Sequence, residues 1–312
     1  MFRPGVIEHM FVMADRYEQA ALIALLRRGD RPWHHYAQLT EAAGSALAIL
    51  DGRYSDPYEE EHLVLFADEP RQDVADLDAI AGEIDTWESE GMAFVTVLDD
   101  GYPINLRSIH NRPPFLFIRG TLLPDDERSI AVVGTRHPSE AGLDAAREVT
   151  EGLVEAGYTI VSGLAHGIDG CAHEPALAHT GQTMAVVGTG LRRTYPTDHA
   201  SLAERIADFG AVVSQFWPDA PPTKTSFPMR NITMSGIALA TVVIEASARS
   251  GARMQARLAL EHGRRVFLHE SLLEHDWARD YAERPGTTVV HSAADAVEQI
   301  ERLTSLEFAL TL

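Results

Sequence analysis

The sequence predicts an α/β fold, in which a doubly wound, mostly parallel sheet follows a small helical N-terminal domain. From Ser129 onward, short apolar runs bounded by glycine or charged residues alternate with stretches of helical periodicity. The runs are apolar at successive positions, which is typical of strands in a parallel sheet covered by helices on both faces. Right-handed crossovers between such strands give an open, doubly wound sheet.

The expected strands and helices follow one another regularly along this part of the chain. The strands are SIAVVGT, YTIVSGLA, TMAVVGTG, GAVVSQF, ATVVIEA, RRVFLHE and TTVVHS. Helical periodicity covers residues 139–156, 167–180, 198–209, 230–240, 251–262 and 292–303. This pattern indicates a Rossmann-like domain, which we place at residues 127–312.

The part of the chain before this domain is expected to be mainly helical. Residues 15–50 carry apolar residues at helical spacing, interrupted by glycine and proline, and a further helix is expected at about residues 76–91. We assign residues 1–92 to a helical N-terminal domain, in which the acidic residues 51–75 form a solvated connection. Residues 93–126 contain one strand and a proline-rich, extended stretch that connects the two domains.

The charge of the chain limits the ways in which it could bind nucleic acid. It holds 46 acidic and 26 basic residues, for a net charge of −20, and residues 51–100 alone hold 16 acidic and 2 basic residues. Tight binding of nucleic acid usually requires a basic surface, because neutralisation of phosphates supplies most of the affinity. Here Lys224 is the only lysine, and arginine suits bidentate phosphate contacts at a single local site.

Composition also indicates the compartment. Cys171 is the only cysteine, which excludes an intramolecular disulfide and fits a reducing environment. No apolar run approaches the roughly 18 residues needed to span a bilayer, and the first residues lack the pattern of a signal peptide. The histidines lack the spacings typical of zinc sites. We therefore expect a cytoplasmic protein without a membrane segment, metal or cofactor.

Several expected strands end in small or glycine-rich turns. These turns are Gly134-Thr135-Arg136, Ser162-Gly163 with the following LAHGID, Gly188-Thr189-Gly190, and Glu245-Ala246 ahead of Ser250-Gly251. Glycine lets a backbone approach a ligand closely, and N–H groups at a helix N-terminus attract anions. The turns would converge on one crevice at the carboxyl edge of the sheet, suited to a phosphate-bearing ligand. The strict G-x-G-x-x-G fingerprint is absent, so a standard NAD site is not expected.

Individual side chains near these turns allow more than one interpretation. Arg136 could bind a phosphate through its guanidinium or pair with an acidic residue of the loop. Two cations, an amide and an aromatic ring lie close together in the sequence, at Lys224, Arg230, Asn231 and Phe227. Such side chains can bind a single strand of nucleic acid by charge and base stacking, although Phe227 could equally pack into the core. Glu245 could act as a general base, accept a hydrogen bond from a ribose hydroxyl, or cap the next turn.

Three further residues are expected to be structural. Asp169 and His173 lie four residues apart on one helix face, a spacing compatible with an acid–base pair. We expect instead that Asp169 braces the preceding loop and that His173 packs and hydrogen-bonds locally. Cys171 lies between them and is expected to be buried rather than nucleophilic.

The order of motifs along the chain carries a family resemblance. The motifs are GTR at 134–136, SGLAHGIDGCAH at 162–173, AVVGTGLRRTYP at 185–196, SFPMRN at 226–231 and VIEASARSGARMQA at 243–256. Together they resemble the DprA/Smf family, the DNA-processing proteins of natural transformation, over about residues 90–300. The resemblance implies a fold of the SLOG superfamily, binding of single-stranded DNA, loading of a RecA-type recombinase for recombination, and a homodimer through the Rossmann-like domain. We expect the apolar helix at residues 253–262 to form part of the dimer contact.

These observations lead to one expected function and two alternatives. The residues expected to bind the ligand are Gly134, Thr135, Arg136, Ser162, Gly163, His166, Gly188, Gly190, Lys224, Phe227, Arg230, Asn231, Glu245, Ser250 and Gly251. We expect a non-catalytic protein that binds single-stranded DNA. A sensor or processing enzyme for a small nucleotide in the same crevice is the alternative, favoured by the acidic N-terminal segment and by Ile232, where the family has an arginine. A third interpretation is a scaffold whose acidic residues 51–100 contact a basic partner or mask the site.

Overall fold

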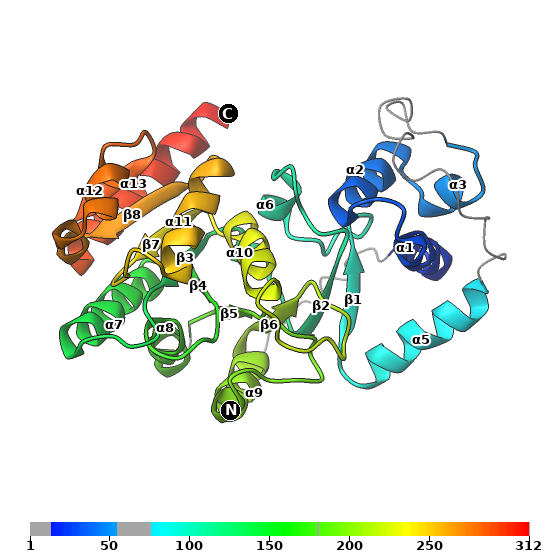
Figure 1. Ribbon diagram of the computed structural model, residues 1–312, viewed down its shortest axis with the longest axis horizontal. Coiled ribbons are helices and arrows are strands. Elements are labelled where there is room, and N and C mark those ends of the chain that lie inside the picture. Colours follow the sequence, from blue (N-terminus) through cyan, green and yellow to red (C-terminus); the bar gives the residue numbers. More distant parts are fainter. Residues whose placement is uncertain (1–13, 55–75, 180, 312) are drawn as a thin grey trace. The chain divides into compact units, whose positions relative to one another are not determined.

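The computed structural model describes residues 14–54, 76–179 and 181–311 (Figure 1). The chain divides into two compact units, one of residues 1–102 with 113–116 and one of residues 103–112 with 117–312. The expected linking stretch at 93–126 contributes residues to both units. Most of the expected acidic connection at 51–75 lies outside the described residues.

The first unit is mainly helical, as predicted. It contains α1 (Arg16–Arg28), α2 (Trp33–Ala43), α3 (Ala46–Leu50), α5 (Leu77–Ser89) and the strand β1 (Ala93–Thr96). Gly29 and Gly44 end α1 and α2 in the left-handed conformation, with φ of 68° and 66°, which glycine adopts without a Cβ clash. Side chains of Asp15 and Asp76 cap α1 and α5 by accepting backbone N–H bonds. The unit closes by packing of α1 against α5, α3 and α2.

The second unit is built on a mostly parallel sheet with the strand order β2-β6-β5-β4-β3-β7-β8-β9. The strands are β2 (Phe115–Gly120), β3 (Ser129–Val133), β4 (Thr159–Ser162), β5 (Thr183–Val186), β6 (Ala211–Ser214), β7 (Ala240–Val243), β8 (Arg265–His269) and β9 (Thr287–Val290). Strands β3 to β9 pair in parallel, which confirms the doubly wound prediction. Strand β2 pairs antiparallel with β6, with Phe117 opposite Ser214.

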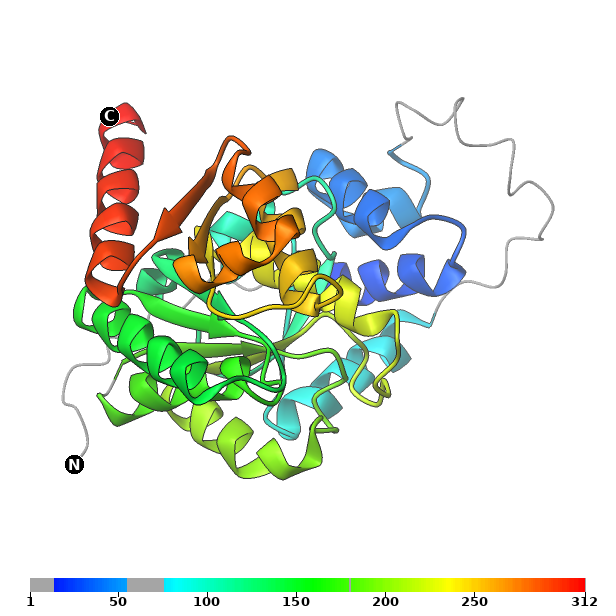
Figure 2. The ribbon, with the colours of Figure 1, turned by 60° about the vertical axis from the view of Figure 1, so that its left-hand side comes forward.

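Helices connect successive strands and cover the sheet. The longer ones are α7 (Glu140–Glu155), α8 (Ile168–Ala178), α9 (Ala200–Phe209), α10 (Ser226–Ile237), α11 (Gly251–Glu261) and α13 (Ala293–Thr311), and the shorter ones are α6 (Ile104–Arg107) and α12 (Asp276–Ala282). Short 3₁₀ turns occur at Pro124–Glu127, Thr197–His199 and Glu270–Glu274. Helices α7 and α8 lie on the side of the sheet opposite to α10 and α11 (Figure 1), and α13 packs beside α7 (Figure 2).

Helix α10 begins earlier than the expected residue 230. The side chain of Thr223 accepts a hydrogen bond from the Ser226 backbone N–H at 2.9 Å, and Ser226 Oγ accepts one from the Thr223 N–H at 3.1 Å. These two hydrogen bonds fix the turn that leads into the helix, which starts four residues upstream and has Phe227 in its first turn.

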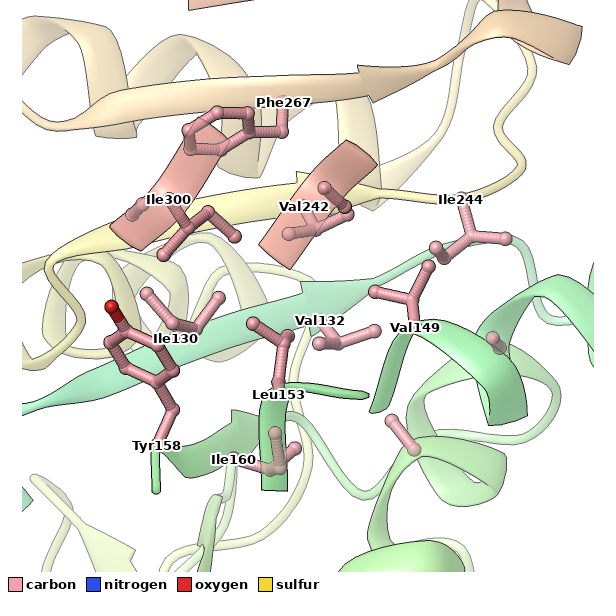
Figure 3. Packing of buried hydrophobic residues seen from close by; sticks show 14 of the residues in the cluster. Ile130, Val132, Val149, Leu153, Tyr158, Ile160, Val242, Ile244, Phe267 and Ile300 are labelled. Atoms are coloured by element: carbon pink, nitrogen blue, oxygen red, sulfur yellow. The ribbon is translucent and has the colours of Figure 1, made fainter. Parts of the chain in front are cut away.

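The core of the second unit lies between the sheet and the helices α7, α8 and α13. Figure 3 shows Ile130, Val132 and Ile160 of the strands meeting Val149 and Leu153 of α7. The same cluster continues to Val242, Phe267 and Ile300, all of them buried. Close packing of these buried side chains between the strands and the helices holds the ends of the strands in fixed positions. In the described part of the chain, no helix is long and apolar enough to cross a membrane.

Candidate functional site

The turns that follow three strands are hydrogen-bonded to one another at the carboxyl edge of the sheet. The backbone N–H of Thr135, after β3, donates to the carbonyl of Glu245, after β7, at 2.6 Å. The carbonyl of Thr135 in turn accepts from the N–H of Ile168, at the start of α8, at 3.2 Å. The N–H of Gly134 donates to the Asp169 carboxylate at 3.3 Å. The turns after β3, β4 and β7 therefore form one rigid frame.

A cavity of about 470 Å³ opens beside this frame. Its walls come from the turn after β3, the first half of α10, and the segment that leads into α11. Predicted site residues that line it are Gly134, Thr135, Arg136, Phe227, Arg230, Asn231, Ser250 and Gly251. The N-terminus of α11 faces this space, capped by Ser250, whose hydroxyl accepts from the Arg253 N–H at 3.1 Å. The volume lies within the range of small-ligand sites and is enough for one nucleotide.

Arg230 forms the inner wall of the cavity and is buried. Its Nη1 donates to the Val186 carbonyl at 3.2 Å and lies 3.9 Å from Oδ2 of Asp169. Asp169 is also buried, and burial raises the pKa of its carboxyl, whereas Arg230 and the Gly134 N–H act in the opposite direction. Gly163 makes room for the pair, because a Cβ there would lie 1.5 Å from Nη1 of Arg230. The guanidinium of Arg230 is thus fixed by protein groups.

Arg136 differs from Arg230 because its side chain is exposed at the mouth of the cavity. Its guanidinium carbon lies 5.5 Å from the centre of the Phe227 ring, within the range of a cation–π contact. Gly188 lies against the same ring, since a Cβ at that position would be 2.8 Å from Phe227 Cδ1. Phe227 is therefore held between the turn after β5 and Arg136.

Four predicted site residues make contacts within the protein and do not line the cavity. Ser162 is fully buried and donates its hydroxyl proton to the Val132 carbonyl at 2.6 Å. Gly163 and Gly188 accommodate Arg230 and Phe227, as described. Gly190 lies against the backbone of Trp217, whose carbonyl oxygen would be 2.0 Å from a Cβ at this position. These small residues allow close contacts within the protein.

Three other predicted residues also lie outside the cavity lining. The Glu245 carboxylate accepts hydrogen bonds from the N–H and the hydroxyl of Ser139 at 3.0 and 2.9 Å, so it braces the N-terminus of α7. His166 is half-exposed and lies 3.6 Å from Asp198. Lys224 is exposed just ahead of α10. The sequence left three interpretations open for Glu245, and the contacts of its carboxylate are with Ser139 rather than with the turn that follows Glu245.

Two further titratable side chains near the frame, His173 and Cys171, belong to α8. His173 is fully buried, and its Nδ1 lies 2.7 Å from Thr183 Oγ1, as expected for a packed and locally bonded residue. Burial lowers the pKa of His173 to about 3 and raises that of the partly buried Cys171 thiol. No group of three or more His, Cys, Asp or Glu among the described residues could hold a metal ion.

Sequence reasoning missed one exposed cation at the cavity. Arg249 lines it from the segment before α11 and makes no ion pair in the described structure. The signal was present, because an arginine directly before the capping Ser250 must lie near the N-terminus of the helix. Met234, Met254 and Gln255 also line the cavity, and they could not be selected from the sequence because their helices also bury other faces.

The sequence of the chain matches a known family. A family model described as DNA recombination-mediator protein A matches residues 93–306. The chain belongs to this family. It is 32% identical to the DNA processing protein DprA of Bacillus subtilis over 217 residues, which are 69% of this chain and 73% of that protein. It is 40% identical to the protein Smf of Escherichia coli over 210 residues, 67% of this chain and 55% of that protein.

Two solved structures of the DprA/Smf family share the fold. The DprA structure from Streptococcus pneumoniae has a TM-score of 0.69 and 29% identity, and the match covers 92% of this chain and 98% of that one. A DprA structure from Helicobacter pylori, described by its single-stranded DNA binding mode, has a TM-score of 0.60 and 24% identity. That match covers 67% of this chain and 96% of the other.

Proposed function

We propose that this chain binds single-stranded DNA at the cavity beside α11, without catalysing a reaction. The observation that carries the proposal is the pair of exposed arginines at the mouth, Arg136 and Arg249, neither of which makes an ion pair with any described residue. In a chain of net charge −20, carboxylates are plentiful, and Arg147, Arg205 and many other arginines are paired with them. Two cations left unpaired at one cavity favour an anionic ligand.

Three features favour a single strand over a duplex. A cavity of about 470 Å³ accepts one unpaired nucleotide but not a base pair with its backbones. Phe227 supplies an aromatic ring beside the cations, a combination that recurs in proteins that bind single strands. The Helicobacter pylori DprA structure, which shares the fold, is described by its binding of single-stranded DNA. These features support binding of a single strand by its phosphates and bases.

The proposal predicts a shallow salt dependence. If Arg136, Arg249 and the nearby Lys224 are the phosphate contacts, the slope of log affinity against log salt should be roughly −2. Arg136→Ala and Arg249→Ala should each weaken binding by about 1–3 kcal/mol, the value for loss of a charge-assisted contact, and should make the slope shallower. Fluorescence polarisation of a labelled oligo-dT across a salt series measures both quantities.

A matched control is Arg265→Ala. Arg265 is also exposed and without an ion pair in the described structure, but it begins β8 and so lies at the amino edge of the sheet. Its substitution should leave affinity and slope unchanged. Saturable binding of a mononucleotide or dinucleotide, with no binding of oligo-dT at low salt, would replace this proposal with the small-nucleotide alternative.

Two further expectations remain proposals. A RecA-type recombinase is the protein partner expected from the family resemblance, and we place the protein in the cytoplasm as a homodimer.

On α11, the expected dimer element, the apolar residues Ala256 and Ala259 are already buried within the unit, and Arg257 and Glu261 form an exposed ion pair of 2.6 Å. A dimer contact through this helix would therefore be made by its polar side.

A further inference from the structure

The most exposed aromatic ring next to the cavity belongs to Tyr195, in the turn after β5. Tyr195 is 44% exposed, although it carries a large and mainly apolar ring. Its ring centre lies 5.6 Å from that of Phe227, with an angle of 50° between the planes. Phe227 itself is partly buried, with Arg136 over its ring and Gly188 against its edge. The more accessible aromatic ring beside the cations is therefore that of Tyr195.

The turn that carries Tyr195 is fixed by the segment after β6. The N–H groups of Gly190 and Arg192 donate to the carbonyls of Ala220 and Pro218, each at 3.0 Å. The side chain of Arg192 also pairs with Asp219 at 2.5 Å. A ring held on a rigid turn loses little conformational entropy when a flat ligand stacks on it. The Tyr195 ring is thus held in a position suited to stacking before the ligand binds.

We propose that Tyr195 stacks against an unpaired base of single-stranded DNA, outside the cavity and next to the phosphate held by Arg136. The inference rests on the proposed function and extends that site by one nucleotide. The Phe227 ring lies within 5.5 Å of the Arg136 guanidinium and 5.6 Å from the Tyr195 ring, so a phosphate bound by Arg136 would bring an adjoining base within reach of the exposed Tyr195 ring. Stacking on an aromatic ring tolerates any base, because each base has a π face.

The test separates base stacking from charge by means of two probes of equal length and charge. One probe is labelled oligo-dT, and the other is the same phosphodiester chain with abasic tetrahydrofuran residues. Tyr195→Ala should weaken binding of oligo-dT by between about fivefold and a hundredfold, the range found for loss of one stacked base, and should leave the salt slope unchanged. The same variant should bind the abasic chain as the wild type does.

Two variants serve as controls. Tyr195→Phe keeps the ring and should bind oligo-dT like the wild type. Phe209→Ala removes a ring that is 59% exposed at the end of α9, ahead of β6 and hence at the amino edge of the sheet, and should have no effect. An unchanged affinity of Tyr195→Ala for oligo-dT, or an equal loss on both probes, would overturn this inference alone. A wild type that binds neither probe would overturn the proposed function with it.

Discussion

The buried pair of Arg230 and Asp169 shapes the inner wall of the candidate site. The sequence motif suggested that Arg230 contacts phosphate, but its Nη1 is directed at the Val186 carbonyl and at Asp169. A charge that is taken out of water must be matched by partners inside the protein. Arg230 therefore mainly stabilises the frame, and it affects ligand binding through the shape of that frame.

We predict that Arg230→Ala lowers the free energy of unfolding by about 3–5 kcal/mol, because it leaves the buried Asp169 without its cation. Arg230→Met combined with Asp169→Leu should lose less than Arg230→Ala alone, since neither buried charge remains. Arg136→Ala, at an exposed position, should stay within about 0.5 kcal/mol of the wild type. Chemical denaturation at neutral pH measures all three. Equal stabilities of Arg230→Ala and Arg136→Ala would contradict this account.

At the scale of elements, His173 joins α8 to the start of β5. Thr183 Oγ1 donates to the Ile160 carbonyl at 3.1 Å, and with its proton used there it can accept a hydrogen bond from His173 Nδ1, in the tautomer that leaves Nε2 unprotonated. Nε2 is buried without a partner among the described residues. Protonation would place a buried N–H there with no acceptor, in agreement with the lowering of the His173 pKa to about 3 by burial.

This arrangement predicts loss of stability in mild acid. The folded-state pKa of His173 lies below the unfolded value near 6.5, so the unfolded chain binds more protons as the pH falls below about 6.5. Between pH 7.5 and pH 5, His173 alone should remove about 2 kcal/mol of the free energy of unfolding. His173→Leu should show a correspondingly smaller loss over this range. Denaturant titrations of both proteins at several pH values test it, and parallel pH profiles would contradict it.

The order of elements could be predicted from the sequence because each element carries its own periodic signal. The runs that form β3 and β7 are apolar on both faces, and the breaks at Gly29 and Gly44 end helices as expected. The antiparallel pairing of β2 with β6 could not be predicted, because it depends on two segments far apart in the sequence.

The site was predictable in its location but not in the roles of its side chains. Glycine-rich turns after parallel strands must share one edge, which located the cavity. Whether an arginine faces the ligand or the protein depends on its neighbours in space. Gly163 leaves room for Arg230, and Ser139 engages Glu245, and neither contact is visible in the local sequence. Arg249 differs from these two, because its place directly before the capping Ser250 is a signal in the local sequence.

At the scale of the whole molecule, the net charge of −20 opposes the approach of DNA to a site that holds few cations. The two effects have different ranges. Contacts at Arg136 and Arg249 act at short distance, whereas repulsion by the remaining carboxylates extends over the Debye length, about 30 Å at 0.01 M salt and about 8 Å at 0.15 M. Low salt strengthens both, so the observed affinity depends on their balance.

We therefore predict that neutralising part of the acidic stretch raises the rate of association with oligo-dT. The change is to replace Glu59, Glu60, Glu61, Asp68 and Glu69, which lie outside the described residues, by glutamine or asparagine. The rate constant measured by stopped flow should rise severalfold at 0.01 M salt, because electrostatic steering acts mainly on association. The gain should disappear above about 0.3 M salt, where the charges are screened, and dissociation should be unaffected. The long-range account would be wrong if the faster association persisted at high salt or if the dissociation rate changed instead. Either result would mean that these carboxylates act on the bound complex by direct contact.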